Sequence, residues 1–224
     1  MANISAFALL ASSVAAIFLM VSPVVATATA FSAGLFGYSE SVQPDTGTFS
    51  QWTQALERRL LDNTAEGDCR EPAFNLCHLR NWLAFLDSLR ERPPREQIEA
   101  VNRYANRKRY VLDFDNYGVE DYWAIPLEFL YNNGDCEDYA ITKLFSLRRL
   151  GFGADELRIV ILQDTNLRVP HAVLAVAVQD DVLILDNQLQ EVVSQRDIVH
   201  YAPVYAINER HWWLYLPEPG SPSR

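Results

Sequence analysis

The 224-residue sequence predicts an α+β domain with helices in its first half and a mostly antiparallel sheet in its second. Two observations lead to this prediction. Apolar residues recur at helical spacing from Phe49 to about Gly151, and short segments rich in β-branched and aromatic residues follow between 157 and 216. Helices followed by strands are typical of an α+β arrangement.

The first thirty residues predict an export signal. MANISAFALLASSVAAIFLMVSPVVATATA has no Asp, Glu, Lys or Arg and ends in the small-residue series Ala26-Thr27-Ala28 and Ala28-Thr29-Ala30, where cleavage is expected. The segment lacks a basic n-region and is long enough for an uncleaved membrane anchor, which is the alternative. Pro23 and the small residues favour cleavage, and both alternatives export the rest of the chain.

About 190 residues remain, enough for one domain with a sizeable core. The formal net charge is −10, and the basic residues are scattered without forming a stripe, so nucleic acid is not an expected partner. We divide the chain into the signal at 1–30, a flexible Gly/Ser/Thr-rich lead at 31–48, one domain at 49–216 and a disordered tail at 217–224.

The helices of the domain are predicted from apolar spacing and from residues that begin or end helices. They are expected to begin near Phe49, near residue 74, at Pro94 and near Asp135 or Cys136. Proline suits a first helical turn, and Gly151 after two arginines suits a helix end. The acidic segment 113–121 is expected to be a polar loop.

Five strands are expected, at 157–163, 171–178, 182–187, 204–208 and 212–216. If Gln179-Asp180 is a two-residue hairpin turn, Val173 lies opposite Asp186. His171 and Asp186 are then diagonal neighbours on one face, about 7–8 Å apart between Cα atoms. A turn one residue longer would place them on opposite faces.

The three cysteines have different expected roles. Cys69 and Cys77 are separated by a short loop and are expected to form a disulfide in an oxidising compartment. Cys136 then has no cysteine to pair with. A single leftover cysteine is either a buried inert thiol or a reactive one. Cys136 falls in the first turn of a helix, where free N–H groups and the helix dipole favour a thiolate.

Cys136, His171 and Asp186 together predict nucleophilic catalysis. Taken singly, His171 is explained as a core or edge histidine and Asp186 as a turn acid. A thiol at a helix start, a histidine on one strand and an acid on the next supply the nucleophile, the base and the group that orients the base.

The segments GDCEDYA, KLFSLRRLGF, PHAVLAV and LILDNQ resemble the bacterial transglutaminase-like cysteine peptidases. VNRYANRKRY, DYWAIPLEF and PVYAIN resemble the LapG-type periplasmic members, so the resemblance runs from about Phe49 to Leu216. It implies a papain/transglutaminase-like fold in which a helical part carries the nucleophile Cys136. The sheet then carries the base His171 and its orienting partner Asp186.

In the family that the chain resembles, acids around the cysteine bind calcium, and the matching residues are Asp135, Glu137 and Asp138. Oxygen ligands suit this hard cation. The alternative is helix capping and dipole pairing by the same acids. Three carboxylates raise the pKa of a neighbouring thiol, whereas a bound dication would cancel their charge. The segment Asp113, Asp115 and Asn116 could add ligands, but a solvated turn is the simpler interpretation.

The resemblance implies a calcium-dependent periplasmic cysteine endopeptidase. Its substrate would be a large surface adhesin that controls biofilm attachment, and an inner-membrane cyclic-di-GMP receptor would sequester the enzyme. One alternative is acyl transfer to an amine, as in true transglutaminases. The other is a non-catalytic binding module stabilised by calcium, against which the intact Cys-His-Asp set argues.

Two further assignments stay open in the sequence. The backbone N–H of Cys136 is one candidate for an oxyanion hole, with Asn132, Asn133 and Trp123 as candidate side-chain donors. The aromatics Trp123, Trp212, Trp213 and Tyr215 could form a partner-binding surface, although core packing is the default for such residues.

Overall fold

The structure, a computed structural model of the chain, describes residues 31, 34–60, 65–71 and 75–217. The predicted signal at 1–30 and residues 218–224 of the predicted tail lie outside these ranges. Within the described ranges, no helix has the length and apolar character needed to cross a membrane.

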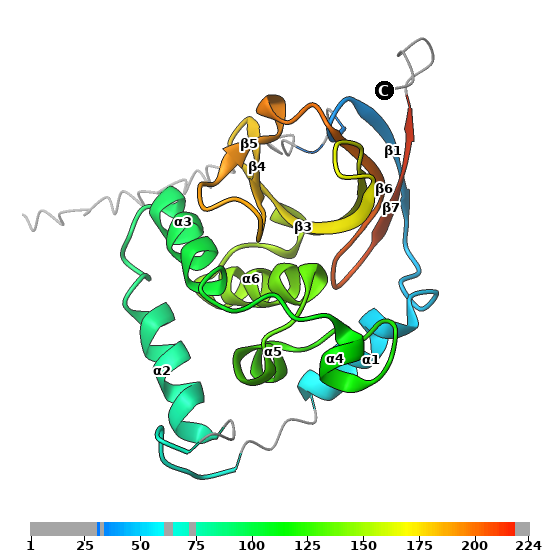
Figure 1. The fold of residues 1–224 in the computed structure, drawn as a ribbon. Coiled ribbons are helices and arrows are strands. Elements are labelled where there is room, and N and C mark those ends of the chain that lie inside the picture. Colours follow the sequence, from blue (N-terminus) through cyan, green and yellow to red (C-terminus); the bar gives the residue numbers. More distant parts are fainter. Residues whose placement is uncertain (1–30, 32–33, 61–64, 72–74, 218–224) are drawn as a thin grey trace, which may run out of the picture.

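Helices and strands occupy separate layers, which confirms the α+β class (Figure 1). The helices are α1 (Ser50–Leu60), α2 (Leu76–Asp87), α3 (Pro94–Ala105), α4 (Asp113–Tyr117), α5 (Pro126–Asn132) and α6 (Cys136–Leu150). The strands are β1 (Tyr38–Gln43), β2 (Leu157–Asp164), β3 (Val169–Val178), β4 (Asp181–Leu185), β5 (Val193–Ser194), β6 (Tyr201–Ile207) and β7 (Trp212–Pro217). They form one antiparallel sheet in the order β1-β7-β6-β2-β3-β4-β5.

Helix α6 lies between the curved sheet and the remaining helices (Figure 1). It packs on β2 and β3 and contacts α2, α3 and α5, so every residue from Glu137 to Leu147 is buried. Asp135 caps its first turn together with Asp138, and Gly151 ends it in the left-handed conformation at φ 104°. Caps at both ends and apolar contacts all round fix the position of its first residue, Cys136.

Apolar residues pack on both faces of the sheet. One core cluster joins α6 and the other helices to residues such as Ile159 and Leu174. A second cluster, on the face away from α6, contains Val160 and Val173 from alternate positions of the same strands. A strand with both faces buried reads as a continuous apolar run, which is why 157–163 and 171–178 were recognisable in the sequence.

The flexible lead predicted at 31–48 is wrong for residues 38–43. They form strand β1, which pairs with β7 along its whole length. Ahead of the strand, Phe31 and Leu35 are fully buried in the second cluster. The sequence YSESVQ is largely polar because the strand lies at the edge of the sheet, where one side chain in two meets solvent.

A buried arginine ties this N-terminal segment to the sheet. The guanidinium of Arg158 in β2 lies 3.9 Å from the Phe31 ring centre and 3.8 Å from that of Trp213. Its Nη2 also donates to Glu40 Oε1 in β1 at 3.2 Å. Two aromatic faces and a carboxylate therefore replace the water that this charge loses on burial.

Several smaller expectations are settled by the structure. Cys69 and Cys77 form the predicted disulfide, with Cα atoms 5.1 Å apart. The polar loop predicted at 113–121 is wrong in its first half, because residues 113–117 form α4. Strand β5 and helix α5, which begins at Pro126, were not predicted.

Leu144→Ala tests whether the burial of α6 in the first core cluster stabilises the domain. Leu144 is fully buried, so its truncation is expected to lower the free energy of unfolding by about 2–5 kcal/mol. The matched control is Leu60→Ala on α1, which removes a side chain that is 86% exposed and should change stability by less than about 0.5 kcal/mol. Urea unfolding followed by circular dichroism measures both, and equal midpoints would contradict this view of the core.

Candidate active site

The β3–β4 hairpin brings His171 and Asp186 together as predicted. Gln179 and Asp180 form a two-residue turn, with Val178 opposite Asp181 and Leu174 opposite Leu185. His171 Nε2 lies 2.9 Å from Asp186 Oδ1, and both side chains are buried. The predicted register is therefore confirmed, and with it the proximity of the two residues.

Asp186 has further partners that sequence reasoning missed. Its Oδ1 also accepts the backbone N–H of Gln188 at 2.8 Å, and its Oδ2 accepts the hydroxyl of Tyr201. Burial raises the pKa of Asp186, but these bonds and the one to His171 outweigh burial and hold the pKa below its ordinary value. Asp186 is thus held as a carboxylate facing the imidazole.

Cys136 lies at the start of α6, beside β3. The backbone N–H of Ala172, next to His171 in the chain, lies close enough to the Cys136 sulfur to act toward a lower pKa of the thiol. Cys136 and His171 line the same cleft of about 210 Å³, together with Asp121, Trp123, Glu137, Ile161, Pro170, Ala172 and Tyr205. The structure therefore assembles the predicted thiol, imidazole and carboxylate at one end of the sheet.

The thiol of Cys136 lies in an environment that opposes its ionisation. Its sulfur is 3.3 Å from Glu137 Oε2. Burial, followed by the charges of Glu137 and Asp135, raises the pKa of the Cys136 thiol far above its ordinary value. The helix start alone does not produce a reactive thiolate here, because like charges and desolvation act against it.

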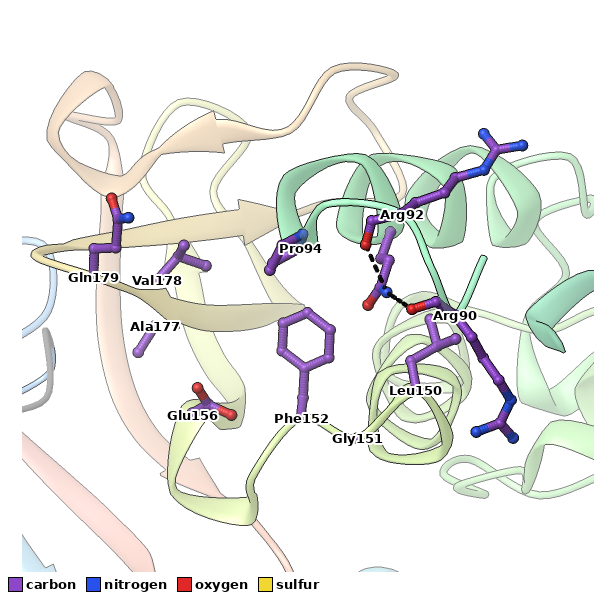
Figure 2. A pocket seen from close by; sticks show the side chains of 11 residues that line it. Arg90, Arg92, Pro94, Leu150, Gly151, Phe152, Glu156, Ala177, Val178 and Gln179 are labelled. Atoms are coloured by element: carbon purple, nitrogen blue, oxygen red, sulfur yellow. Dashed lines mark hydrogen bonds between the residues drawn. The ribbon is translucent and has the colours of Figure 1, made fainter. Parts of the chain in front are cut away.

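A larger hollow, of about 530 Å³, lies elsewhere, between the end of α6, the β3–β4 turn and the start of α3. Figure 2 shows its apolar wall at Phe152 and Leu150. Gln97, which also lines it, donates to the carbonyls of Arg90 and Arg92 at 3.1 and 3.0 Å. None of the predicted catalytic or metal residues lines it. Size alone does not mark the active site in this fold.

The three predicted metal residues gather with Asp113, whose role was underestimated. Two groups of carboxylates have oxygens within 4.8 Å of one another: Asp113, Asp135 and Asp138, and Asp113, Asp121 and Glu137. Asp113 is only 2% exposed, so the solvated turn expected there is wrong for this residue. Asp115 on the same short helix is exposed, as expected for a solvated turn.

Asp138 binds the local backbone with both oxygens. Its Oδ1 accepts the N–H of Ala124 at 2.6 Å, and its Oδ2 accepts that of Asp135 at 3.2 Å. A Cβ at Gly134 would lie 2.0 Å from Asp138 Oδ2, so only glycine fits before Asp135. Capping was expected of Asp135, with only dipole pairing expected of Asp138. Asp138 thus adds a capping bond to the Asp135 N–H, and this bond coexists with its membership of the carboxylate cluster.

The carboxylate cluster lacks a positively charged partner within the described ranges. Burial is the main cause that raises the pKa of Asp113 to about 6, and it also raises the pKa values of Asp135, Glu137 and Asp138. Buried Oδ1 atoms of Asp113 and Asp135 have no hydrogen-bond partner. Among the described residues, no ion pair involves any of the four acids. Partnerless buried carboxylate oxygens fit a hard divalent cation.

The three candidate side-chain donors for the oxyanion hole lie in different places in the structure. Asn133 Oδ1 accepts the N–H of Arg109, and Asn132 Nδ2 lies 3.4 Å from the Tyr117 hydroxyl. Trp123 alone among the three side-chain candidates lines the cleft, although its Nε1 donates to Asp121 Oδ1 at 3.1 Å.

The aromatic residues considered for a partner surface pack in the core. Trp123, Trp213 and Tyr215 are 4–6% exposed, and Trp212 packs against the first core cluster. Core packing, the default interpretation, therefore accounts for them.

Comparison with known proteins identifies the family. A family model described as the bacterial transglutaminase-like cysteine proteinases matches residues 69–218. The chain belongs to this family. No curated protein sequence matches the chain significantly. Membership makes the protein a cysteine peptidase that acts on a protein substrate, and it confirms the family predicted from the sequence motifs.

Solved structures of a LapG protease show the same fold. Legionella pneumophila LapG is 33% identical over 62% of this chain and 76% of its own, with a TM-score of 0.56. Its calcium-bound form is 30% identical over 74% of this chain and 86% of its own, and its EGTA-treated form is 30% identical over 77% and 87%. Both give a TM-score of 0.58, so the cysteine peptidase is LapG-like.

Asp113→Asn is expected to stabilise the metal-free protein. A carboxyl whose pKa is higher in the folded than in the unfolded chain destabilises the fold once it ionises. This penalty is small below about pH 4, grows as the unfolded chain ionises, and is fully developed above about pH 6. In EGTA at pH 7 the variant should therefore gain about 1–3 kcal/mol, and at pH 4 it should match the wild type.

Urea unfolding at the two pH values measures this difference. Asp115→Asn, an exposed acid two residues along the same helix, is the matched control and should change stability by less than about 0.5 kcal/mol. An Asp113→Asn variant less stable than the wild type at pH 7 in EGTA would contradict the electrostatic description of the cluster.

Proposed function

We propose that the protein is a calcium-dependent cysteine endopeptidase in which Cys136, His171 and Asp186 form the catalytic triad. The observation that supports this most directly is the 2.9 Å bond between His171 Nε2 and Asp186 Oδ1 beside the Cys136 thiol, in a member of a cysteine peptidase family.

Asp186 determines which imidazole nitrogen reacts. Because the carboxylate accepts from Nε2, the proton of neutral His171 stays on that atom and Nδ1 keeps its lone pair. Nδ1 takes the thiol proton of Cys136 while the sulfur bonds to the peptide carbonyl carbon and an electron pair moves to the oxygen. The backbone N–H of Cys136 is the proposed donor to that oxygen.

The remaining steps return the groups to their starting state. His171 gives its Nδ1 proton to the peptide nitrogen, the C–N bond breaks and an acyl-enzyme remains on Cys136. His171 then takes a proton from a water molecule, whose oxygen attacks the acyl carbon and displaces the thiolate, and the thiolate recovers that proton from Nδ1. Asp186 stabilises the imidazolium in both halves of the reaction through its bond to Nε2.

We assign the calcium ligands to Asp135, Glu137 and Asp138, as predicted, and add Asp113. Bound calcium would supply the positive charge that the cluster lacks and so favour the Cys136 thiolate. Partnerless oxygens on Asp113 and Asp135, and the similarity to a LapG solved in calcium-bound and EGTA-treated forms, support this assignment.

The resemblance to LapG-type proteases supports a more specific biological proposal. The substrate is a large surface adhesin that controls biofilm attachment, and an inner-membrane cyclic-di-GMP receptor sequesters the enzyme. The N-terminal sequence supports export to the periplasm by a cleaved signal at 1–30.

Cleavage of candidate adhesin fragments from the same genome tests the proposed activity. Purified protein with calcium should cut a fragment, and Cys136→Ala and EGTA should each abolish the cut, because the nucleophile and the charge that ionises it are removed in turn. Mass spectrometry of the products checks for a new free N-terminus, which distinguishes hydrolysis from transfer to an added amine. Cleavage that survives EGTA would reject calcium dependence, and helix capping would then be the role of these acids.

The pH dependence of Cys136 alkylation tests the electrostatic role of calcium separately. Iodoacetamide reacts with the thiolate, so adding calcium should move the midpoint of the rate–pH curve to lower pH, because the carboxylates that raise the thiol pKa are then neutralised. His171→Ala should slow labelling at neutral pH. An identical curve in calcium and in EGTA would reject the charge effect while leaving the nucleophile assignment intact.

A further inference from the structure

The two oxygens of Asp186 have different partners. Oδ1 accepts from His171 Nε2 at 2.9 Å and from the Gln188 backbone at 2.8 Å. Oδ2 accepts the hydroxyl of Tyr201, the first residue of β6, which is only 5% exposed. A carboxylate held at both oxygens cannot rotate about its Cβ–Cγ bond without losing a hydrogen bond.

The Tyr201 ring is itself held in place. Phe36 meets it edge-to-face at 5.7 Å and 87°, and the His171 ring meets it at 6.0 Å and 62°. The backbone N–H of Phe36 donates to Gln195 Oε1 at 2.9 Å, which anchors that ring in turn. The hydroxyl is thus presented to Asp186 by a ring packed on two sides.

The buried Lys143 does not take the place of the Tyr201 hydroxyl. Lys143 on α6 is fully buried, and its Nζ lies 3.5 Å from the Leu185 carbonyl oxygen. Its charge acts on Asp186 at longer range, and burial lowers the pKa of Lys143 to about 7. Burial also raises the pKa of the Tyr201 hydroxyl, so this group stays protonated and remains a donor at every physiological pH.

We propose that Tyr201 is a positioning residue for the catalytic reaction: its hydroxyl fixes the Asp186 carboxylate so that Oδ1 faces His171 Nε2. This orientation keeps the imidazole proton on Nε2 and leaves Nδ1 free to accept the Cys136 proton. The inference rests on the proposed triad. It assigns to Tyr201 no contact with the substrate, so its effect belongs to the chemical step and not to binding.

Tyr201→Phe removes only the hydroxyl and keeps the packed ring. Tyr215→Phe is the matched control, because Tyr215 is a buried tyrosine of the same apolar cluster whose hydroxyl binds Arg158 and not Asp186. On the fragment that the wild type cleaves, Tyr201→Phe should lower kcat about 10- to 100-fold with KM unchanged, since a hydrogen bond to a charged group is lost. Tyr215→Phe should leave both constants unchanged.

A second readout does not depend on turnover. In the chain labelled with ¹⁵N-histidine, NMR should show His171 wholly as the Nε2–H tautomer in the wild type and in Tyr215→Phe, and as a mixture in Tyr201→Phe. Unchanged kcat and an unchanged tautomer in Tyr201→Phe would overturn the inference. If the wild type cleaves nothing but the tautomer still changes in Tyr201→Phe, the positioning role is supported and the proposed peptidase activity on that substrate fails.

Discussion

The fixed contact between the start of α6 and the first residues of β3 is the constraint on which the site depends. Helix α6 is buried against the sheet along most of its length, so Cys136 cannot move relative to β3 without disturbing the core. Ala172, beside His171, lines the same cleft as Cys136 at this contact. The thiol and the imidazole that line the cleft are therefore carried by two rigid elements and not by a loop.

The start of α6 also holds several carboxylates close to the Cys136 thiol. Asp135, Glu137 and Asp138 lie in the first turn of α6 or cap it, and α4 adds Asp113 from the other side. Helix capping explains the bond of Asp138 to the Asp135 N–H, but it does not explain the partnerless oxygens of Asp113 and Asp135. The peptidase thus carries a local destabilisation that a counter-charge or protonation of the carboxyls relieves, which is the usual cost of placing function in a buried polar cluster.

The parts of the fold that the sequence predicts well are those encoded locally. Both ends of α6 follow from Asp135 and Gly151, and the His171–Asp186 proximity follows from a two-residue turn and a period of two. Strand β1 could not be predicted in this way, because its polar sequence becomes a strand only by pairing with β7. Asp113 and Tyr201 had no local signal either: their burial and partners depend on segments distant in the chain, and Tyr201 is one of ten tyrosines.

The pairing of β1 with β7 also has a consequence for the newly made chain. Ser39 and Leu216 bond across a separation of 177 residues, so the strand made first receives its partner last. Until β7 has been synthesised, β1 has no neighbour in the sheet, and the rings around Arg158 are incomplete because Trp213 is missing. The segment that carries Phe36 is then not held against Tyr201 by a finished sheet edge. The packing of Phe36 against Tyr201, and with it part of the support of Asp186, therefore depends on residues from both ends of the domain.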